Sequence, residues 1–384
     1  MGGCCDFLVA QPLFWLRVWR IFVTFGIVKN LFAILLMLAA AFLPLHYVLE
    51  RDLCEGQPQV VRPPRRARIV VAGDLMQHTP QLTAARQADG SYDFSESFRY
   101  VAPYFRNADL AVVNLETTLS RGGSYSGYPC FCSPAEVADA MVDMGVDVAL
   151  LANNHCLDRG AAGVRATADI LDSCGIVRMG VFRDSVDYAA GSVRYMRAGD
   201  VRLAMVNYTY GTNGIPVPKG VVVNPLDTLF IGRELAQIER DKVDCVVAFV
   251  HWGNEYERKP NSDQRRVAEF MKRNGVDIII GSHPHVVQPY EIDAEGKIVV
   301  YSLGNFVSNQ SKRYTDGGLI VTIDIEEDSA GELKYYLGYT PVWVSRPKYT
   351  LLPPAVGDTL RMGGEAREAY RTFMTDTEKL LSAK

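Results

Sequence analysis

The chain lacks the sequence signatures of several large functional classes. No Cys-x-x-Cys pair occurs among its eight cysteines, which argues against zinc ribbons and thioredoxin-type redox sites. A Walker A loop, a G-x-G-x-x-G turn that opens a helix and a G-x-S-x-G elbow are also absent from the sequence. Basic residues are not in excess, because the net charge is −4, so the composition does not indicate nucleic-acid binding.

A long apolar run is present near the N-terminus. Residues 31–49 carry no formal charge, and about 20 such residues are enough for a helix that crosses a bilayer. Arg17, Arg20 and Lys29 precede the run, as in an uncleaved signal-anchor, although the basic segment 62–68 follows it and leaves the orientation open. We therefore predict a single-pass protein of the cell membrane with an extracytoplasmic catalytic domain; a buried core helix is the alternative.

The remaining chain divides into a linker, a large domain and a tail. An anchor region over 1–50 is followed by a Pro- and Arg-rich linker over 51–67. Short runs of Val, Ile, Leu and Ala then end in polar or glycine residues, at 68–74, 108–116, 147–155, 202–210, 244–253, 276–285 and 298–306. Helical capping patterns lie between several of these runs, with starts at Ser133, Asp158 and Ser262.

This alternation predicts an α/β layer fold over residues 68–355, with strands that are buried on both faces. No helical pattern separates the apolar runs at 298–306 and 317–326, so we expect part of the sheet to be antiparallel. Residues 356–384 are predicted to form an amphipathic and mostly exposed helical tail.

Polar side chains gather where the predicted strands end. In layered α/β folds this edge holds ligand-binding crevices, so residues far apart in sequence can meet there. The candidates are two carboxylates, an amide and four of the six histidines, namely Asp74, Glu116, Asn154, His155, His251, His283 and His285. Each alone could be a turn, a cap or a hydrogen-bonded core residue, but the coincidence of four histidines favours one joint site.

The chemistry of this set is that of a metal centre. Imidazole, carboxylate and amide ligands without thiolate suit Mn, Fe or Zn. The set exceeds the ligands of one tetrahedral zinc, so two ions that share a carboxylate are the other possibility.

Six ordered motifs carry a family resemblance. "AGDLM", "NLET", "LANNHCLDRG", "VHWGNEY", "GSHPHVVQ" and "YSLGNF" resemble the CapA/PgsA family of poly-γ-glutamate capsule biosynthesis proteins, a branch of the calcineurin-like metallophosphoesterase superfamily. The resemblance runs from about residue 68 to residue 307. It implies a four-layer α/β/β/α sandwich with a dinuclear metal site at one sheet edge.

The resemblance also implies roles for single residues. Asp74, Glu116, Asn154, His251, His283 and His285 would be metal ligands, while His155 would be a general acid or electrostatic stabiliser oriented by Asp158. One departure is Met76, which stands where the superfamily has histidine. One ion site therefore lacks an imidazole unless His78 reaches it, and the chain would hold one or two divalent ions.

The sequence leaves the type of bond that is cleaved open between a phosphoester and a γ-glutamyl amide. The Gly-rich segment 120–131 contains Tyr125 and Tyr128, which with Asn305 are candidate substrate contacts; an ordinary packed crossover is the alternative for this segment, and 207–214 is a weaker candidate loop. The leading hypothesis is a metal-dependent hydrolase or transferase that acts on an anionic polymer, poly-γ-glutamate. A non-catalytic scaffold of a capsule-synthase membrane complex and a general phosphoesterase are the alternatives.

Overall fold

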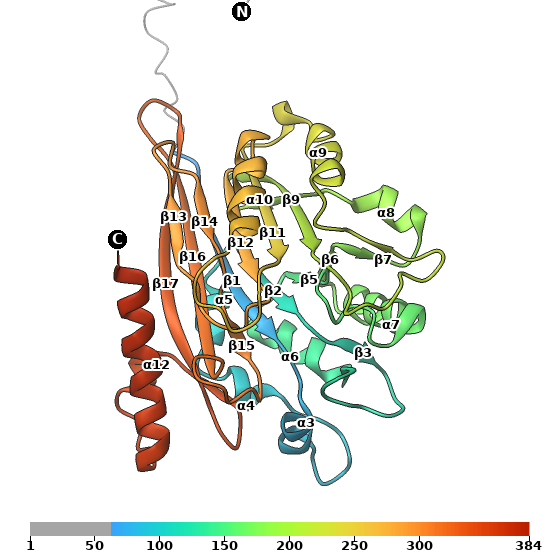
Figure 1. Ribbon diagram of the computed structural model, residues 1–384, viewed down its shortest axis with the longest axis vertical. Coiled ribbons are helices and arrows are strands. Elements are labelled where there is room, and N and C mark those ends of the chain that lie inside the picture. Colours follow the sequence, from blue (N-terminus) through green and yellow to red (C-terminus); the bar gives the residue numbers. More distant parts are fainter. Residues whose placement is uncertain (1–62, 384) are drawn as a thin grey trace, which may run out of the picture. The chain divides into compact units, whose positions relative to one another are not determined.

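Two mixed β-sheets form the centre of the protein in the computed structural model, which describes residues 63–383 (Figure 1). The first sheet has the order β18-β17-β16-β1-β2-β5-β6, with β15 also paired to β1. Its strands are β1 (Arg66–Leu75), β2 (Leu110–Leu115), β5 (Val148–Leu150), β6 (Val177–Met179), β15 (Asn305–Val307), β16 (Gly317–Glu327), β17 (Leu333–Ser345) and β18 (Thr350–Leu352).

The second sheet has the order β13-β14-β12-β11-β9-β8. Its strands are β8 (Arg194–Ala198), β9 (Val201–Thr209), β11 (Cys245–His251), β12 (Ile278–Ser282), β13 (Tyr290–Ile292) and β14 (Ile298–Val300). Two small pairs complete the strands, β3 (Thr118–Ser120) with β4 (Cys132–Pro134), and β7 (Val181–Phe182) with β10 (Val222–Val223). The strands that lead into the site run parallel, whereas β16–β18 are antiparallel, as the missing helix predicted.

Helices cover the outer faces of the two sheets. They are α3 (Thr79–Ala85), α4 (Ser95–Phe98), α5 (Ala102–Arg106), α6 (Glu136–Met144), α7 (Gly160–Ser173), α8 (Ser185–Gly191), α9 (Thr228–Ala236), the 3-10 turn η1 (Arg240–Lys242), α10 (Ser262–Arg273), α11 (Pro354–Gly357) and α12 (Gly364–Ser382). Within the described part of the chain, none of them combines the length and apolar character that a bilayer crossing needs. The helix predicted at 31–49 lies outside the described residues.

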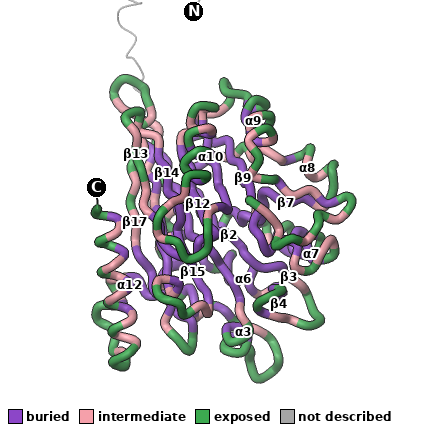
Figure 2. The backbone as a smooth tube through the Cα atoms, in the orientation of Figure 1, coloured by how far each residue is buried: buried purple, intermediate pink, exposed green. Residues whose placement is uncertain are grey.

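The layers follow from the two-residue period of the strands. In β1, Val70 and Ala72 pack with helices α3–α7, while Ile69 and Val71 face the second sheet. In β11, Phe249 faces back toward the first sheet, and its neighbours pack with α9 and α10. Most strands of the two sheets are therefore buried on both faces, whereas β8, β13 and β17 are partly exposed (Figure 2). The predicted mixed α/β class is confirmed, and the layers run α/β/β/α.

The chain passes from the second sheet to the first between β14 and β15, within residues 301–304. The crossing is tight, because a Cβ atom on Gly73 of β1 would lie 2.0 Å from the carbonyl oxygen of Gly304. Gly304 itself has a φ of 69°, a conformation that glycine adopts without strain. This close approach pairs Asp74 with Asn305 across the two parallel strands.

Three predicted boundaries differ from the structure. Strand β1 begins at Arg66, and the Arg65 guanidinium pairs with Asp244 at 2.5 Å, so the predicted linker ends earlier than residue 67. Ser133 lies in strand β4 and does not cap a helix, because pairing with β3 holds it extended; α6 begins at Glu136. The other two predicted helices begin within two residues of their expected starts.

The predicted amphipathic and mostly exposed tail helix is confirmed as α12, and its buried face joins the core of the folded unit. Helix α12 lies along β17 (Figure 1), buries Tyr370 against Trp343 and places Phe373 in the same core. A domain boundary at residue 355 would therefore separate side chains that share one core.

Replacing Phe373 by alanine is expected to lower the free energy of unfolding by about 3–5 kcal/mol, because it empties a buried aromatic site. Thr375→Ala on the exposed side of α12 is the matched control and should change stability by less than about 0.5 kcal/mol. Chemical denaturation of the full chain measures both. Equal stability of the two variants would mean that α12 is not part of the core.

Candidate metal centre

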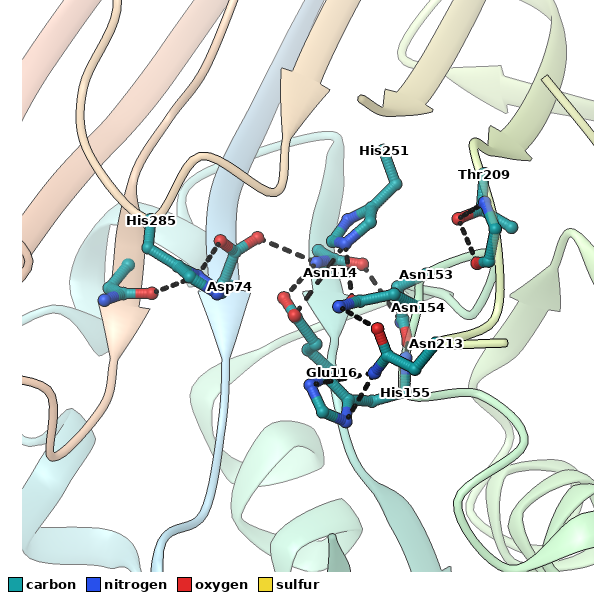
Figure 3. A network of polar contacts seen from close by, with 12 residues as sticks. Asp74, Asn114, Glu116, Asn153, Asn154, His155, Thr209, Asn213, His251 and His285 are labelled. Atoms are coloured by element: carbon teal, nitrogen blue, oxygen red, sulfur yellow. Dashed lines mark hydrogen bonds and ion pairs between the residues drawn. The ribbon is translucent and has the colours of Figure 1, made fainter. Parts of the chain in front are cut away.

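The candidate ligands come from both sheets and meet at their carboxyl edges (Figure 3). Asp74 lies near the end of β1, and Glu116 follows β2 directly. His251 ends β11, and the loop after β12 carries His283 and His285. These parallel strands end at the same edge, which is why residues separated by two hundred positions share one site.

The first group consists of Asp74, Glu116 and His285. One ligand atom from each lies within 4.8 Å of the others, and all three side chains are buried. His285 Nδ1 lies 3.0 Å from Asp74 Oδ2 and 3.1 Å from Asn305 Oδ1. Because both neighbours accept hydrogen bonds, Nδ1 carries the ring proton here, and a cation shared with Asp74 would replace that proton.

The second group is built around the same glutamate. His251 Nε2 lies 3.7 Å from Glu116 Oε1 and 2.9 Å from Asn154 Oδ1. The ring centroid of His283 lies 4.8 Å from that of His251. Glu116 therefore stands between the two groups, in the position of a carboxylate that two ions could share.

The electrostatics of the site suit a cation. Burial, and then the charge of Asp74, raises the pKa of Glu116 well above 4.5. Burial also lowers the pKa of His251, and that of His283 to about 3, so both rings are neutral near pH 7 and able to coordinate a metal. Glu116 Oε1 and the Nδ1 atoms of both rings are buried without a hydrogen-bond partner among the described residues. Unsatisfied buried acceptors of this kind fit a divalent ion.

The backbone that carries two of the histidines is strained. His283 has a φ of 99° and His285 a φ of 58°, which are uncommon for residues other than glycine. The main-chain N–H of Tyr256 donates to the carbonyl of Pro284 between them at 2.8 Å. Such conformations persist where the surroundings impose them, and they cluster at functional sites.

Asn114 holds the two carboxylates together and was not identified from the sequence. Its Nδ2 donates to Asp74 Oδ1 at 2.8 Å and to Glu116 Oε2 at 3.2 Å. Asn153 supports it, because its own Nδ2 lies 3.3 Å from Asn114 Oδ1 and 2.9 Å from the Leu115 carbonyl. The sequence does contain a feature that could have identified Asn114. It is a polar amide within the apolar strand β2, two residues before Glu116 and therefore on the same face of the strand.

A cleft of about 440 Å³ opens beside the second group. It is lined by Tyr128, Pro129, Cys130, Asn154, His155, Asp158, Asn213, Ile215 and Glu255. His155 Nδ1 lies 2.8 Å from Asp158 Oδ2, and the Phe131 N–H donates to the same oxygen at 2.6 Å. The Asn213 amide contacts Asn154 and lies 3.5 Å from the His155 ring nitrogens, so the loop 207–214 does reach the site.

Of the three candidate substrate contacts, only Tyr128 lines the cleft. Tyr128 is 75% exposed at the cleft, whereas Tyr125 packs edge-on against Tyr92 and is not among the lining residues. Asn305 is fully buried, and its contact with His285 gives it an orienting position.

His78 does not join the first group. Its Nδ1 lies 3.2 Å from Gln81 Oε1 and 3.3 Å from the Asn309 N–H, which hold the ring at the start of α3. The buried Met76 offers no nitrogen, so His285 is the imidazole of that group.

Comparison of the chain with known proteins identifies its family. The family model described as "Bacterial capsule synthesis protein PGA_cap" matches residues 68–310, which include all the candidate ligands. The chain belongs to the PGA_cap family.

Two relatives illustrate the membership. The "PGA biosynthesis protein CapA" of Bacillus subtilis (strain 168) is 29% identical over 271 residues, which cover 68% of each chain. The "Capsule biosynthesis protein CapA" of Bacillus anthracis is 28% identical over 277 residues, which cover 69% of this chain and 65% of that one. The PGA_cap chain thus spans about two thirds of their length. A 5'-nucleotidase from Candida albicans SC5314 aligns with a TM-score of 0.43 and 11% identity, covering 83% of this chain and 59% of that one.

Saturating Mn²⁺ or Zn²⁺ is expected to stabilise this PGA_cap protein by about 2.7 kcal/mol at a hundredfold excess over Kd, as for any ligand that binds only the folded state. Glu116→Gln should remove most of that effect, because it removes the carboxylate that both groups share. Glu368→Gln on the exposed face of α12 is the control. Melting temperatures with the metal or with EDTA measure the effect; equal shifts in both variants would exclude Glu116 as a ligand.

Without divalent ions, the wild type is expected to lose stability relative to Glu116→Gln as the pH rises above about 4.5, while His251 and His283, whose pKa values are lowered, act in the opposite direction in both proteins. The pKa of Glu116 is raised in the folded state, so the folded chain keeps a proton that the unfolded chain has already lost, and stability decreases until the folded pKa is passed. The difference in stability between the wild type and Glu116→Gln should therefore change steadily with pH. Denaturation in EDTA between pH 5 and pH 8 measures it.

Proposed function

We propose that this protein is a membrane-anchored, metal-dependent hydrolase or transferase that acts on poly-γ-glutamate during capsule synthesis. The observation that carries the proposal is the convergence of Asp74, Glu116 and His285, whose ligand atoms lie within 4.8 Å of one another. Membership of the PGA_cap family and the likeness to two CapA proteins support the choice of polymer. The uncharged run at 31–49 would supply the anchor, with the catalytic domain outside the cytoplasm.

One or two divalent ions of Mn, Fe or Zn fit the donor set. Asp74, Glu116 and His285 would hold one, and Glu116, Asn154, His251 and His283 would hold the other. Bound there, such ions would supply an acidic water and stabilise a developing oxyanion.

His155 is placed to give a proton to the leaving group. With the proton on Nδ1, its ring donates to Asp158, which fixes the orientation of the ring. Phe131 contacts the imidazole edge-on at 4.7 Å between ring centroids and restrains it further. Because the ring lines the cleft, Nε2 is the nitrogen available to a substrate.

A second candidate function is a non-catalytic component of a capsule-synthase membrane complex. The observation that favours it is Met76, which leaves the first group with a single imidazole. In that case the ions would stabilise the fold, and His155 would take no part in turnover. Cleavage of a phosphoester by the same groups is the third candidate.

His155→Ala is expected to lower kcat on γ-linked glutamate oligomers about 10²–10⁴-fold, because it removes the proton donor. The metal content by elemental analysis and the melting temperature should stay near wild type, since His155 is not a proposed ligand. Tyr125→Phe, outside the cleft lining, is the control. If the wild type turns over neither these oligomers nor a chromogenic phosphodiester with Mn²⁺, the scaffold function is the correct one.

A further inference from the structure

Exposed tyrosines surround the candidate metal centre. The ring centroid of Tyr210 lies 4.4 Å from that of His283, and the ring centroid of Tyr256 lies 6.2 Å from that of His285. Both tyrosines are partly exposed, as is Tyr128 at the neighbouring cleft. Tyrosine in such a position offers an apolar ring to a substrate and a hydroxyl to water.

A lysine lies over one of these rings. Lys312 Nζ is 3.9 Å from the ring centroid of Tyr256, within the range of a cation–π contact. Among the described residues Lys312 forms no ion pair with a carboxylate, whereas its neighbour Arg313 pairs with Asp376. The ammonium group is therefore held in place while its charge stays available to an anion.

The loop that carries Lys312 is tied to the first group of candidate ligands. The carbonyl of Lys312 accepts hydrogen bonds from the N–H of Thr315 at 2.9 Å and from its hydroxyl at 2.7 Å. Asn305 Nδ2 donates to the Thr315 carbonyl at 2.7 Å, and Asn305 Oδ1 contacts His285. Asn305 thus ties the main chain of the Lys312 loop to the site.

The ring of Tyr256 belongs to a residue whose main chain is held by the loop that carries the two histidines. Tyr256 has a φ of 66°, and its N–H bonds to Pro284 between the two histidines. Glu255 and Asp158 line the cleft, and Glu255 also interacts with Tyr256, the residue whose ring lies under Lys312. Against these carboxylates, Lys312 is the group that would attract a carboxylate of a polyanionic chain.

We propose that Lys312, held on the ring of Tyr256, binds a free carboxylate of an extended anionic polymer on one side of the reacting bond. Each γ-linked glutamate residue carries such a carboxylate beside methylene groups that can pack on a tyrosine ring. The inference rests on the proposed function for its polymer, and it adds the residue that recognises the charge of that polymer.

The test is the affinity of the full chain for γ-linked glutamate oligomers, measured by titration calorimetry with Mn²⁺ present. Lys312→Ala is expected to weaken binding about tenfold, the usual effect of losing a hydrogen bond to a charged group. Lys312→Arg should restore most of it. Lys379→Ala, an exposed lysine of α12, is the matched control and should bind as wild type.

Two further ligands test whether binding depends on the charge of the carboxylates. An oligomer whose carboxylates are converted to carboxamides should bind wild type and Lys312→Ala equally, and a short phosphodiester should not respond to the substitution. Equal affinity of wild type and Lys312→Ala for the charged oligomer, or no binding by wild type, overturns the inference. Lys312-dependent binding without turnover supports the inference and contradicts the hydrolase proposal alone.

Discussion

Two carboxylates buried side by side are the constraint on which the rest of the site depends. Moving an ionised carboxylate out of water costs several kcal/mol unless a positive charge or hydrogen bonds compensate it. Here Asp74 and Glu116 share one amide, that of Asn114, and no lysine or arginine of the described residues forms an ion pair with either. The nearby rings of His251 and His283 are held neutral by their own burial. A bound cation would remove the cost and would give Glu116 Oε1 the partner that it lacks among the described residues.

The layers of the fold could be predicted because strands buried on two faces leave a direct mark in the sequence. Runs such as residues 245–250 are apolar at every position, and they are too short for most helices. The start of α6 could not be predicted in this way. Ser133, Pro134 and Glu136 form a good capping pattern, but pairing with β3 holds Ser133 extended, and local propensity yields to that long-range contact. The burial of α12 likewise depends on β17, which no pattern within residues 364–382 reveals.

The candidate ligands were predictable because histidine, aspartate and glutamate are unusual at the end of an apolar strand. The structure brings Asp74, Glu116, Asn154, His251, His283 and His285 to one edge. Asn114 and Asn213 act only through contacts made across the fold, so their roles could not be assigned from one sequence. The motif that contains Asn305 could be recognised in the sequence. Its burial and its hydrogen bond to the loop of Lys312 could not be predicted, because they depend on contacts across the fold.

The crossing at residues 301–304 determines where this chain can change its length. Asp74 is paired with Asn305 immediately after the crossing, and side chains alternate across a strand, so one inserted residue there would turn Asn305 away from His285. The close contact between Gly73 and Gly304 leaves no room for a bulge that could absorb the insertion. The segments 120–131 and 211–220 run over the surface and carry no such pairing with β1. Changes of length are therefore expected in those two surface segments, while the inner crossing is restricted to a single length.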